Sequence, residues 1–201
     1  EKEKRTLKFS EIFGFGAGGM FTYGFQLMIT GYYLLYYMTD IAGFSTVLAA
    51  SLYSTIQIIK MVTMLFSGVI IDAINFRSGK YRTWVLVSGI GLGLFFPLSF
   101  FYYPLPQSIY VVVFMIIYTL QTLFYNVGWT AMRAVIGKVA KNKADVVALN
   151  TSAQSAGTIS SILYGYIGYP ILGIALWAGT KQAYGCASAI YGLTIILGAI
   201  Y

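Results

Sequence analysis

Residues 47–71 read VLAASLYSTIQIIKMVTMLFSGVII, and this stretch decides the fold. Lys60 is its only charged residue. A helix needs about 20 consecutive apolar residues to cross the hydrocarbon core of a bilayer, so the stretch predicts a transmembrane helix. A charged side chain near the centre of such a helix costs roughly 3 kcal/mol on insertion scales. Lys60 therefore indicates a functional position or a specific partner.

The composition of the whole chain is typical of a membrane protein. Of its 201 residues, 58% are hydrophobic and 9% are charged, whereas a soluble domain has about 25% charged residues. The chain has no histidine, and its single cysteine, Cys186, excludes an intrachain disulfide. We therefore expect an all-α integral membrane protein without a metal site or a cofactor.

Six apolar runs predict six transmembrane helices. The runs cover approximately residues 12–38, 47–71, 84–103, 109–132, 149–172 and 184–201. The turn YYPLPQS at residues 102–108 contains two prolines and separates the third run from the fourth. Cytoplasmic loops are expected at about residues 72–83 and 133–148.

The basic residues predict the orientation of these helices. Positive charges concentrate on the cytoplasmic side of membrane proteins. All but two of the 13 basic residues lie before the first run, after the second or after the fourth, which is one side of a six-helix chain. Lys181 lies on the opposite side, and Lys60 lies within the second run. The prediction is a multi-pass protein of the plasma or inner cell membrane with a cytoplasmic N-terminus.

This topology signal also explains the net charge of +7. Nucleic-acid binding is not expected, because the basic residues are dispersed over three segments and form no continuous stripe. An enzyme is not expected either. The chain has no histidine, no cysteine with a basic partner nearby in the sequence and no pair of carboxylates inside the apolar runs.

The segment GVIIDAINFRSGKYRTW at residues 68–84 has a glycine one turn before an aspartate and a Gly-Lys-x-Arg turn near its end. We expect the glycine to let two helices approach closely and the aspartate to cap a helix or pair with the loop arginines. A basic loop that only sets the topology is the alternative. The residues assigned to this gating loop are Gly68, Asp72, Arg77, Gly79, Lys80 and Arg82.

The gating loop resembles the signature between helices two and three of the major facilitator superfamily. Its RSGKYRTW end is most similar to the glycoside–pentoside–hexuronide cation symporters, the melibiose-permease-like group. Three further stretches are similar to that family: YYLLYYMTDIAGFS at residues 32–45, NVGWTAM at 126–132 and ALNTSAQSAG at 148–157. The resemblance extends over about residues 9–174 and rests on the order and spacing of these motifs together.

The resemblance implies that residues 1–201 form the amino-terminal six-helix half of a major-facilitator-type bundle. In such a fold, two six-helix halves face each other across a central substrate cavity and rock to alternate access. The implied partners are a small-molecule substrate, the lipid bilayer and a second six-helix half, which is either another copy or a missing carboxy-terminal half.

The family's second helix carries two aspartates, one turn apart, that bind the coupling cation. The matching stretch here is QIIKMVTML at residues 57–65. Gln57 stands at the family's arginine and Lys60 at its first aspartate. Thr63 stands at its asparagine and Met64 at its second aspartate. The resemblance therefore implies that the usual sodium site is lost at these four cation-site positions.

Three interpretations of Lys60 stay open. In the first, its ammonium group replaces the cation and satisfies Asn126, Thr63 and backbone carbonyls. In the second, it pairs with an anionic substrate such as a uronide or a sugar acid. In the third, it pairs with a carboxylate of the absent half, since its distance from the helix end disfavours snorkelling. An error in the matched register would change all three.

Polar and aromatic side chains within the apolar runs are the candidates for substrate binding. Sugar hydroxyl groups need planar hydrogen-bonding partners, and sugar C–H faces stack on aromatic rings. The candidates are Tyr23, Gln26, Tyr32, Gln121, Asn126, Trp129, Asn150 and Gln154. The alternative for each amide is an interhelical hydrogen bond that holds the bundle together. The family's fifth-helix arginine is absent, because the matching position is near Ala153.

The predicted function is a secondary transporter that works by alternating access on a sugar, a glycoside or a related small solute. The alternative is a non-transporting six-helix sensor, scaffold or degenerate family member. The loss of both aspartates favours this alternative, whereas the retained amides and the gating loop oppose it.

Overall fold

The computed structural model describes residues 6–19, 33–76 and 79–200, and within these ranges it contains helices and no strand. The helices, in chain order, are α1 (Phe9–Gly19), α3 (Leu34–Tyr36), the π-helix η3 (Tyr37–Ile41), α4 (Thr46–Ala73), α5 (Lys80–Phe100), α6 (Gln107–Val139), α7 (Lys143–Ala175), the 3-10 helix η4 (Leu176–Ala178) and α8 (Ala183–Ile200). The protein is therefore all-helical over its described residues.

Four of the described helices are long and apolar enough to cross a membrane, namely α4, α5, α6 and α8. Helix α7 has 33 residues but is not among the four. The first predicted span, about residues 12–38, includes residues 20–32, which lie outside the described ranges. The structure supports a helical membrane protein. A total of six membrane spans stays a prediction.

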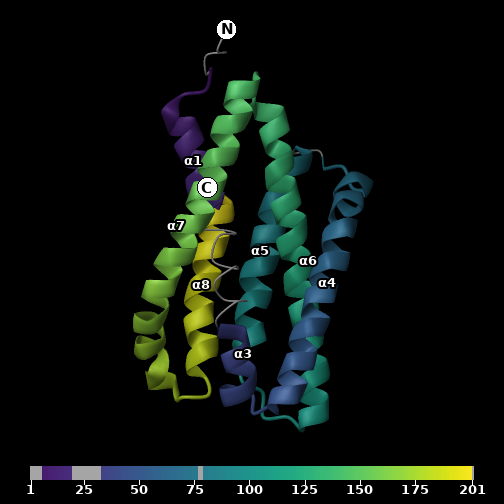
Figure 1. Ribbon diagram of the computed structural model, residues 1–201, viewed down its shortest axis with the longest axis vertical. Helices are drawn as coiled ribbons and strands as arrows, with labels where there is room; N and C mark the ends of the chain where they lie inside the picture. Colours follow the sequence, from purple (N-terminus) through teal and green to yellow (C-terminus); the bar gives the residue numbers. More distant parts are fainter. Residues whose placement is uncertain (1–5, 20–32, 77–78, 201) are drawn as a thin grey trace.

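The helices pack into a bundle whose order in space differs from their order along the chain. Helix α5 packs against α6 and α8, α4 packs on α6, and α1 packs on α7. Figure 1 shows α4 and α7 on opposite sides of the bundle, with α5, α6 and α8 between them. Helix α6 therefore has α5 on one side and α4 on another, which places its polar side chains at helix–helix contacts.

Helices α5 and α8 approach closely because two glycines face each other. A Cβ atom added at Gly93 would lie 2.7 Å from the carbonyl oxygen of Gly192, so a larger residue there would separate the helices. Small residues at such contacts are how transmembrane helices pack without a hydrophobic driving force between them.

An aromatic core fills one end of the bundle. The hydroxyl group of Tyr37 donates to the carbonyl oxygen of Phe101 at 2.8 Å and lies 2.7 Å from the hydroxyl group of Tyr110. Phe100 and Phe114 pack against the same ring. Because these buried hydroxyl groups bond within the cluster, the η3 segment is fixed against α5 and α6.

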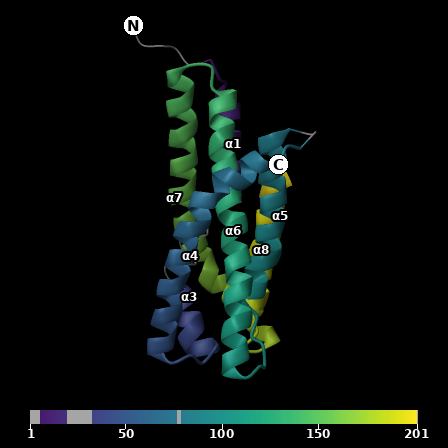
Figure 2. The same ribbon diagram turned by 90° about the vertical axis from the view of Figure 1, so that its right-hand side faces the viewer.

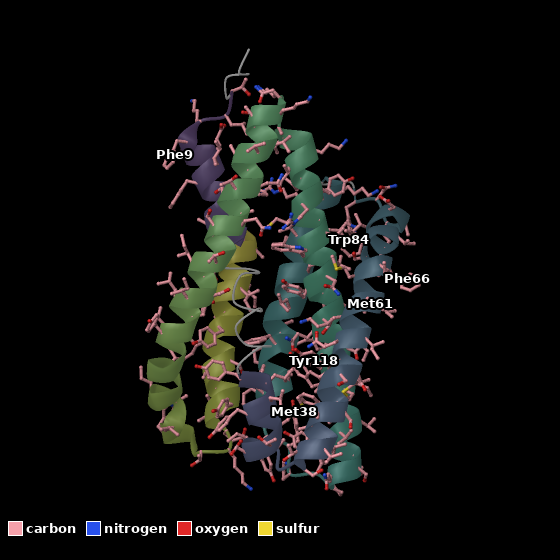
Figure 3. All side chains as sticks on the ribbon, in the orientation of Figure 1. Phe9, Met38, Met61, Phe66, Trp84 and Tyr118 are labelled. Carbon is pink, nitrogen blue, oxygen red and sulfur yellow. The ribbon has the colours of Figure 1, made fainter. Side chains whose placement is uncertain are left out.

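The basic segments gather at the other end of the bundle. The start of α1, the end of α4, the start of α5 and the link between α6 and α7 all lie toward this end, in both views (Figures 1 and 2). Phe9 and Trp84 lie toward it as well, and Met38 lies toward the aromatic end (Figure 3). The connection that carries Lys181 is at the aromatic end.

The loop expected at residues 133–148 is much shorter in the structure. Helix α6 continues to Val139, and α7 begins at Lys143, so only residues 140–142 separate them. The Asn142 side chain caps α7 by accepting a hydrogen bond from the Asp145 amide at 2.8 Å. Hydropathy marks only the apolar part of a helix, whereas the helix itself continues through polar residues until a cap ends it.

Candidate functional site

Lys60 lies on the face of α4 that packs on α6. Buried residues recur on this face at helical spacing, at Ala49, Ile56 and Ser67. We call the set Ala49, Ile56, Lys60, Thr63 and Ser67 the inner stripe of α4, since steps of three, four and seven residues keep side chains on one side of a helix. The outer side of α4 is apolar and exposed, as Phe66 shows in Figure 3.

Asn126 joins α6 to this inner stripe. Its side chain is 6% exposed, and its amide nitrogen donates to the carbonyl oxygen of Lys60 at 3.0 Å and to the hydroxyl oxygen of Thr63 at 2.7 Å. The Thr63 hydroxyl in turn donates to the carbonyl oxygen of Ile59 at 2.8 Å. The threonine oxygen therefore both accepts from α6 and donates within α4, which satisfies a buried hydroxyl and a buried amide together.

A second polar contact lies one turn further along both helices. The hydroxyl groups of Ser67 and Thr130 are 2.8 Å apart, and Ser67 also donates to the carbonyl oxygen of Met64 at 2.7 Å. We call the two contacts together the α4–α6 seam: Lys60, Thr63 and Ser67 of α4 with Asn126 and Thr130 of α6. Hydrogen bonds between membrane helices contribute about 0.6 kcal/mol each.

We expected the Lys60 ammonium group to replace the cation and to satisfy Asn126 and Thr63. In the structure these two residues have other contacts. The contact of Lys60 with Asn126 is made by its carbonyl oxygen, and Thr63 is bonded to the Asn126 amide instead. The ammonium group is half-buried, and it has no hydrogen bond or ion pair with any described residue. Asparagine supplies its own amide donor to the oxygen atoms that the ammonium group was expected to satisfy.

The other two cation-site positions face outward. Gln57 and Met64 are both exposed on α4. The structure thus brings Lys60 and Thr63 together with Asn126 and leaves Gln57 and Met64 away from this contact. None of the four side chains is a carboxylate, so the described residues of this region offer no hard, charged oxygen ligand for sodium.

The predicted substrate residues of the described chain have different surroundings. Gln121 is buried and accepts a hydrogen bond from the Ser99 hydroxyl of α5 at 2.6 Å. Asn150 is half-buried and donates to the carbonyl oxygen of Val146 within its own helix at 3.0 Å. Gln154 is exposed on α7. Tyr23, Gln26 and Tyr32 lie outside the described residues.

Trp129 belongs to an aromatic row on α6 that the sequence analysis did not identify. The rings of Tyr125 and Trp129 are stacked, with centroids 6.4 Å apart and planes at 9°. The guanidinium carbon of Arg133 lies 4.7 Å from the centroid of the Trp129 ring. We call these three residues the α6 ladder. Their spacing of four residues is the signal that identifies such a row in a helix.

Arg133 therefore belongs to α6 and not to the cytoplasmic loop in which we expected it. An arginine over a tryptophan face is stabilised by the ring quadrupole, by about 0.5–1 kcal/mol at exposed sites. The α6 ladder presents two ring faces and one cation along one side of the helix.

Only two of the gating-loop residues, Asp72 and Lys80, form an ion pair in the described part of the chain. The Lys80 ammonium group lies 2.6 Å from a carboxylate oxygen of Asp72, and Gly79 precedes α5 with φ of +102°, a conformation that favours glycine. Arg82 is exposed and Arg77 lies outside the described residues. A Cβ atom at Gly68 would meet no atom of the described residues within 4 Å, so none of the described helices makes the close approach expected there.

A buried carboxylate at the start of α7 was also missed. Asp145 has no exposed surface, and its oxygens accept from the amides of Thr6 at 2.9 Å and Leu7 at 3.3 Å and from the Thr6 hydroxyl. The Thr6 hydroxyl and these amides stabilise the charged form and lower the pKa of Asp145 below its ordinary value. The pattern Asn142-x-x-Asp145 is the signal of a helix start that the sequence offered.

Comparisons with known proteins agree with this architecture. Residues 14–201 match the family described as MFS/sugar transport protein. The isoprimeverose transporter of Lactiplantibacillus pentosus is 22% identical over 198 residues, which is 98% of this chain and 41% of the relative. YagG of Escherichia coli K12, named as a candidate glycoside/cation symporter, is 27% identical over 184 residues, which is 90% of this chain and 39% of the relative.

A third relative extends the pattern. The inner membrane symporter YicJ of Escherichia coli K12 is 24% identical over 135 residues, which is 65% of this chain and 29% of the relative. The names of all three describe transporters or symporters and none describes an enzyme. The chain spans about two fifths of the length of the first two relatives.

Proposed function

Because the chain belongs to the MFS/sugar transport protein family, within the glycoside–pentoside–hexuronide group of cation symporters, we propose that it is the amino-terminal half of a secondary transporter. The solute is a sugar, a glycoside or a related small molecule. Transport proceeds by alternating access and without the usual sodium site of the family.

The α4–α6 seam is the observation that carries this proposal. It is a polar, hydrogen-bonded contact between two helices long and apolar enough to cross a membrane, and the resemblance matches Lys60 and Thr63 to cation-site positions of the family. The chain has six acidic residues, and they are Glu1, Glu3, Glu11, Asp40, Asp72 and Asp145. Since none lies near the middle of α4, α5, α6 or α8, no carboxylate of this chain supports a sodium site there.

Uptake into proteoliposomes tests both parts of the proposal. Radiolabelled isoprimeverose is a suitable first solute, because one relative is named for its transport. We expect uptake above that of empty liposomes and the same initial rate in sodium and in choline buffers. Stimulation by an inward sodium gradient would contradict the loss of the sodium site. An absence of uptake for isoprimeverose and for a panel of other glycosides would contradict transport by a pair of these chains.

A non-transporting sensor or scaffold is the second candidate, and the absence of carboxylates from these helices favours it. Thermal stability in detergent separates the two functions. A sensor is stabilised by the solute that it binds but gives no uptake, whereas a transporter gives both. A scaffold gives neither.

A second six-helix half is part of the proposal, because polar side chains that face a central cavity are costly against lipid. Light scattering of the detergent-solubilised protein, corrected for bound detergent, measures whether two 22.1 kDa chains associate. A particle of a single chain that still transports solute would contradict the need for a second half.

A further inference from the structure

Two buried hydrogen-bond donors of α5 have no acceptor in the described part of the chain. They are the indole N–H of Trp84, a residue that is 7% exposed, and the hydroxyl group of Ser88, which has no exposed surface. A buried donor without an acceptor costs free energy, so most such groups in proteins are bonded to other protein groups or to ordered water. The pair therefore needs an acceptor that the described residues do not supply.

Both side chains lie on the side of α5 that faces α6. Ser88 follows Trp84 by four residues and precedes Phe95 by seven, and these steps keep side chains on one side of a helix. Phe95 stacks on Phe124 of α6. Trp84 packs in one cluster with Ala131 of α6. The two donors are thus one turn apart within the α5–α6 contact, about 6 Å along the helix axis.

The Ser88 hydroxyl group differs from other hydroxyl groups of these helices. Ser51, Thr83 and Ser99 each donate to the carbonyl oxygen four residues earlier. Such a bond satisfies a helical serine or threonine within its own helix. Ser88 makes no such bond in the structure. Its hydroxyl group is therefore available to a ligand between α5 and α6.

The position excludes a large or a charged ligand. Ser88 has no exposed surface, so neither a second six-helix half nor a transported solute can contact it. A charged ligand has no counter-ion here, because Lys80, one turn before Trp84, is already paired with Asp72 at 2.6 Å. Water is small enough and accepts from both donors. Its own hydrogens can bond the second lone pairs of helix carbonyl oxygens.

We propose that the α5–α6 contact binds ordered water through the indole N–H of Trp84 and the hydroxyl group of Ser88. Lys80, Trp84 and Ser88 follow one another at four-residue spacing, so the site lies directly behind the ion pair of the gating loop. A water-mediated hydrogen bond is nearly as favourable as a direct one. Because water can reorient, the two donors stay bonded when the start of α5 shifts on α6. The site is present whether the chain transports a solute or serves as a scaffold.

Nuclear magnetic resonance of the detergent-solubilised protein tests the site. The chain has three tryptophans, Trp84, Trp129 and Trp177, so labelling with [¹⁵N]tryptophan gives one indole N–H signal for each. The variant Trp84→Phe identifies the signal of Trp84 by its loss. We expect a cross-relaxation peak between the Trp84 indole proton and water, although the ring is buried. Absence of this peak in the unchanged protein would overturn the proposal.

The variant Ser88→Ala tests the second donor. The bound water loses one of its partners, so we expect the peak between the Trp84 indole proton and water to be lost. Ser99→Ala is the matched control, since it is the same substitution on the same side of the same helix. The Ser99 hydroxyl already bonds the Phe95 carbonyl and the Gln121 side chain, so this variant should keep the peak. A peak that persists unchanged in Ser88→Ala would overturn the role of Ser88.

Thermal stability separates bound water from proton exchange through the Ser88 hydroxyl group itself. Removal of an unsatisfied hydroxyl group from an apolar contact costs nothing, so the apparent melting temperature in detergent would stay equal or rise. A hydroxyl group that is bonded to water predicts instead that Ser88→Ala lowers the melting temperature by about 2–4 °C. A Ser88→Ala variant at least as stable as the unchanged protein would therefore overturn the binding of water by Ser88.

Discussion

At the scale of single residues, Asn126 is the side chain on which the α4–α6 contact depends most. Its amide nitrogen bonds a carbonyl oxygen and a hydroxyl group of α4, and both bonds are shielded from water. An aspartate at this position would place a charge there and would have no proton to donate when ionised. The asparagine therefore suits a seam in which its own amide is the donor to both oxygen atoms of α4.

Replacement of this asparagine tests how much it contributes to the stability of the fold. Asn126→Ala removes two interhelical hydrogen bonds, so we expect a loss of about 1 kcal/mol in the free energy of unfolding. This loss should lower the apparent melting temperature in detergent by about 2–4 °C, measured by tryptophan fluorescence. Asn150→Ala is the matched control, because its amide bonds only a carbonyl of its own helix. Equal melting temperatures for Asn126→Ala and the unchanged protein would refute the structural role.

The sequence could predict that Lys60, Thr63 and Asn126 meet, but neither how they meet nor the contact between Ser67 and Thr130. The resemblance to a known family placed Lys60, Thr63 and Asn126 near one another, since aligned helices carry aligned positions. The choice between an ammonium and an amide as the donor depends on rotamers and on the relative depth of α4 and α6. No single sequence contains that information. The α6 ladder was missed because its members were considered singly and not at their common spacing.

At the scale of elements, Asp145 ties the segment before α1 to the start of α7. The two segments are far apart in the sequence, and the bonds from Thr6 and Leu7 join them at the end where the basic residues gather. The Ser152 hydroxyl strengthens the same pairing by donating to the carbonyl oxygen of Ile12 at 2.8 Å. Helix α1 is thereby held on α7.

This tie should depend on pH. The pKa of Asp145 is lowered from 3.8, first by the Thr6 hydroxyl and also by the backbone amides. A carboxylate whose pKa is lower in the folded state stabilises the fold above its unfolded pKa, and the stabilisation is lost as the pH falls through the folded pKa. We therefore expect the Thr6 and Leu7 amides to be protected from hydrogen exchange at pH 5 to 7 and to lose protection below about pH 4.

The variant Asp145→Asn removes the charge of the side chain and keeps its shape, so it separates the two effects. It should lower the protection of both amides and make the remaining protection independent of pH, because the asparagine oxygen still accepts but carries no charge; mass spectrometry of the N-terminal peptide, after correction for intrinsic exchange rates, measures this. Asp40→Asn is the control, because Asp40 is exposed at the other end of the bundle and bonds only to its neighbour Thr39. Protection that stays constant from pH 7 to pH 2 in the unchanged protein would contradict a role for the Asp145 charge.

Helix positions were predictable where an apolar run and the helix end together. The range 84–103 lies close to α5 (Lys80–Phe100), and the range 184–201 lies close to α8 (Ala183–Ile200). The ends of α6 and α7 were predicted poorly, because lysine and alanine continue a helix past the apolar region and only a cap such as Asn142 ends it. Hydropathy therefore locates membrane helices better than it locates their ends.

At the scale of the whole molecule, charge separates the two ends of the bundle. The segments that carry most of the basic residues lie together, and the aromatic end has Lys181 over the Tyr102 ring, with 4.6 Å between the ammonium nitrogen and the ring centroid. A chain whose helices are inserted with the basic end in the cytoplasm keeps these charges on the side where membrane proteins concentrate them. In this orientation Arg133 would lie nearer the cytoplasm than Lys60.

Cysteine labelling measures this orientation directly. With Cys186→Ala as the background, Lys138→Cys reports the basic end and Lys181→Cys reports the aromatic end, and both positions are exposed. In intact cells, a membrane-impermeant maleimide should label the cysteine at position 181 but label the cysteine at position 138 only after the membrane is opened, because the positive charges predict that the basic end faces the cytoplasm. The background protein without cysteine should stay unlabelled in both conditions. Labelling of position 138 in intact cells, with position 181 protected, would mean that the chain has the opposite orientation, with the basic end and Arg133 toward the outer surface.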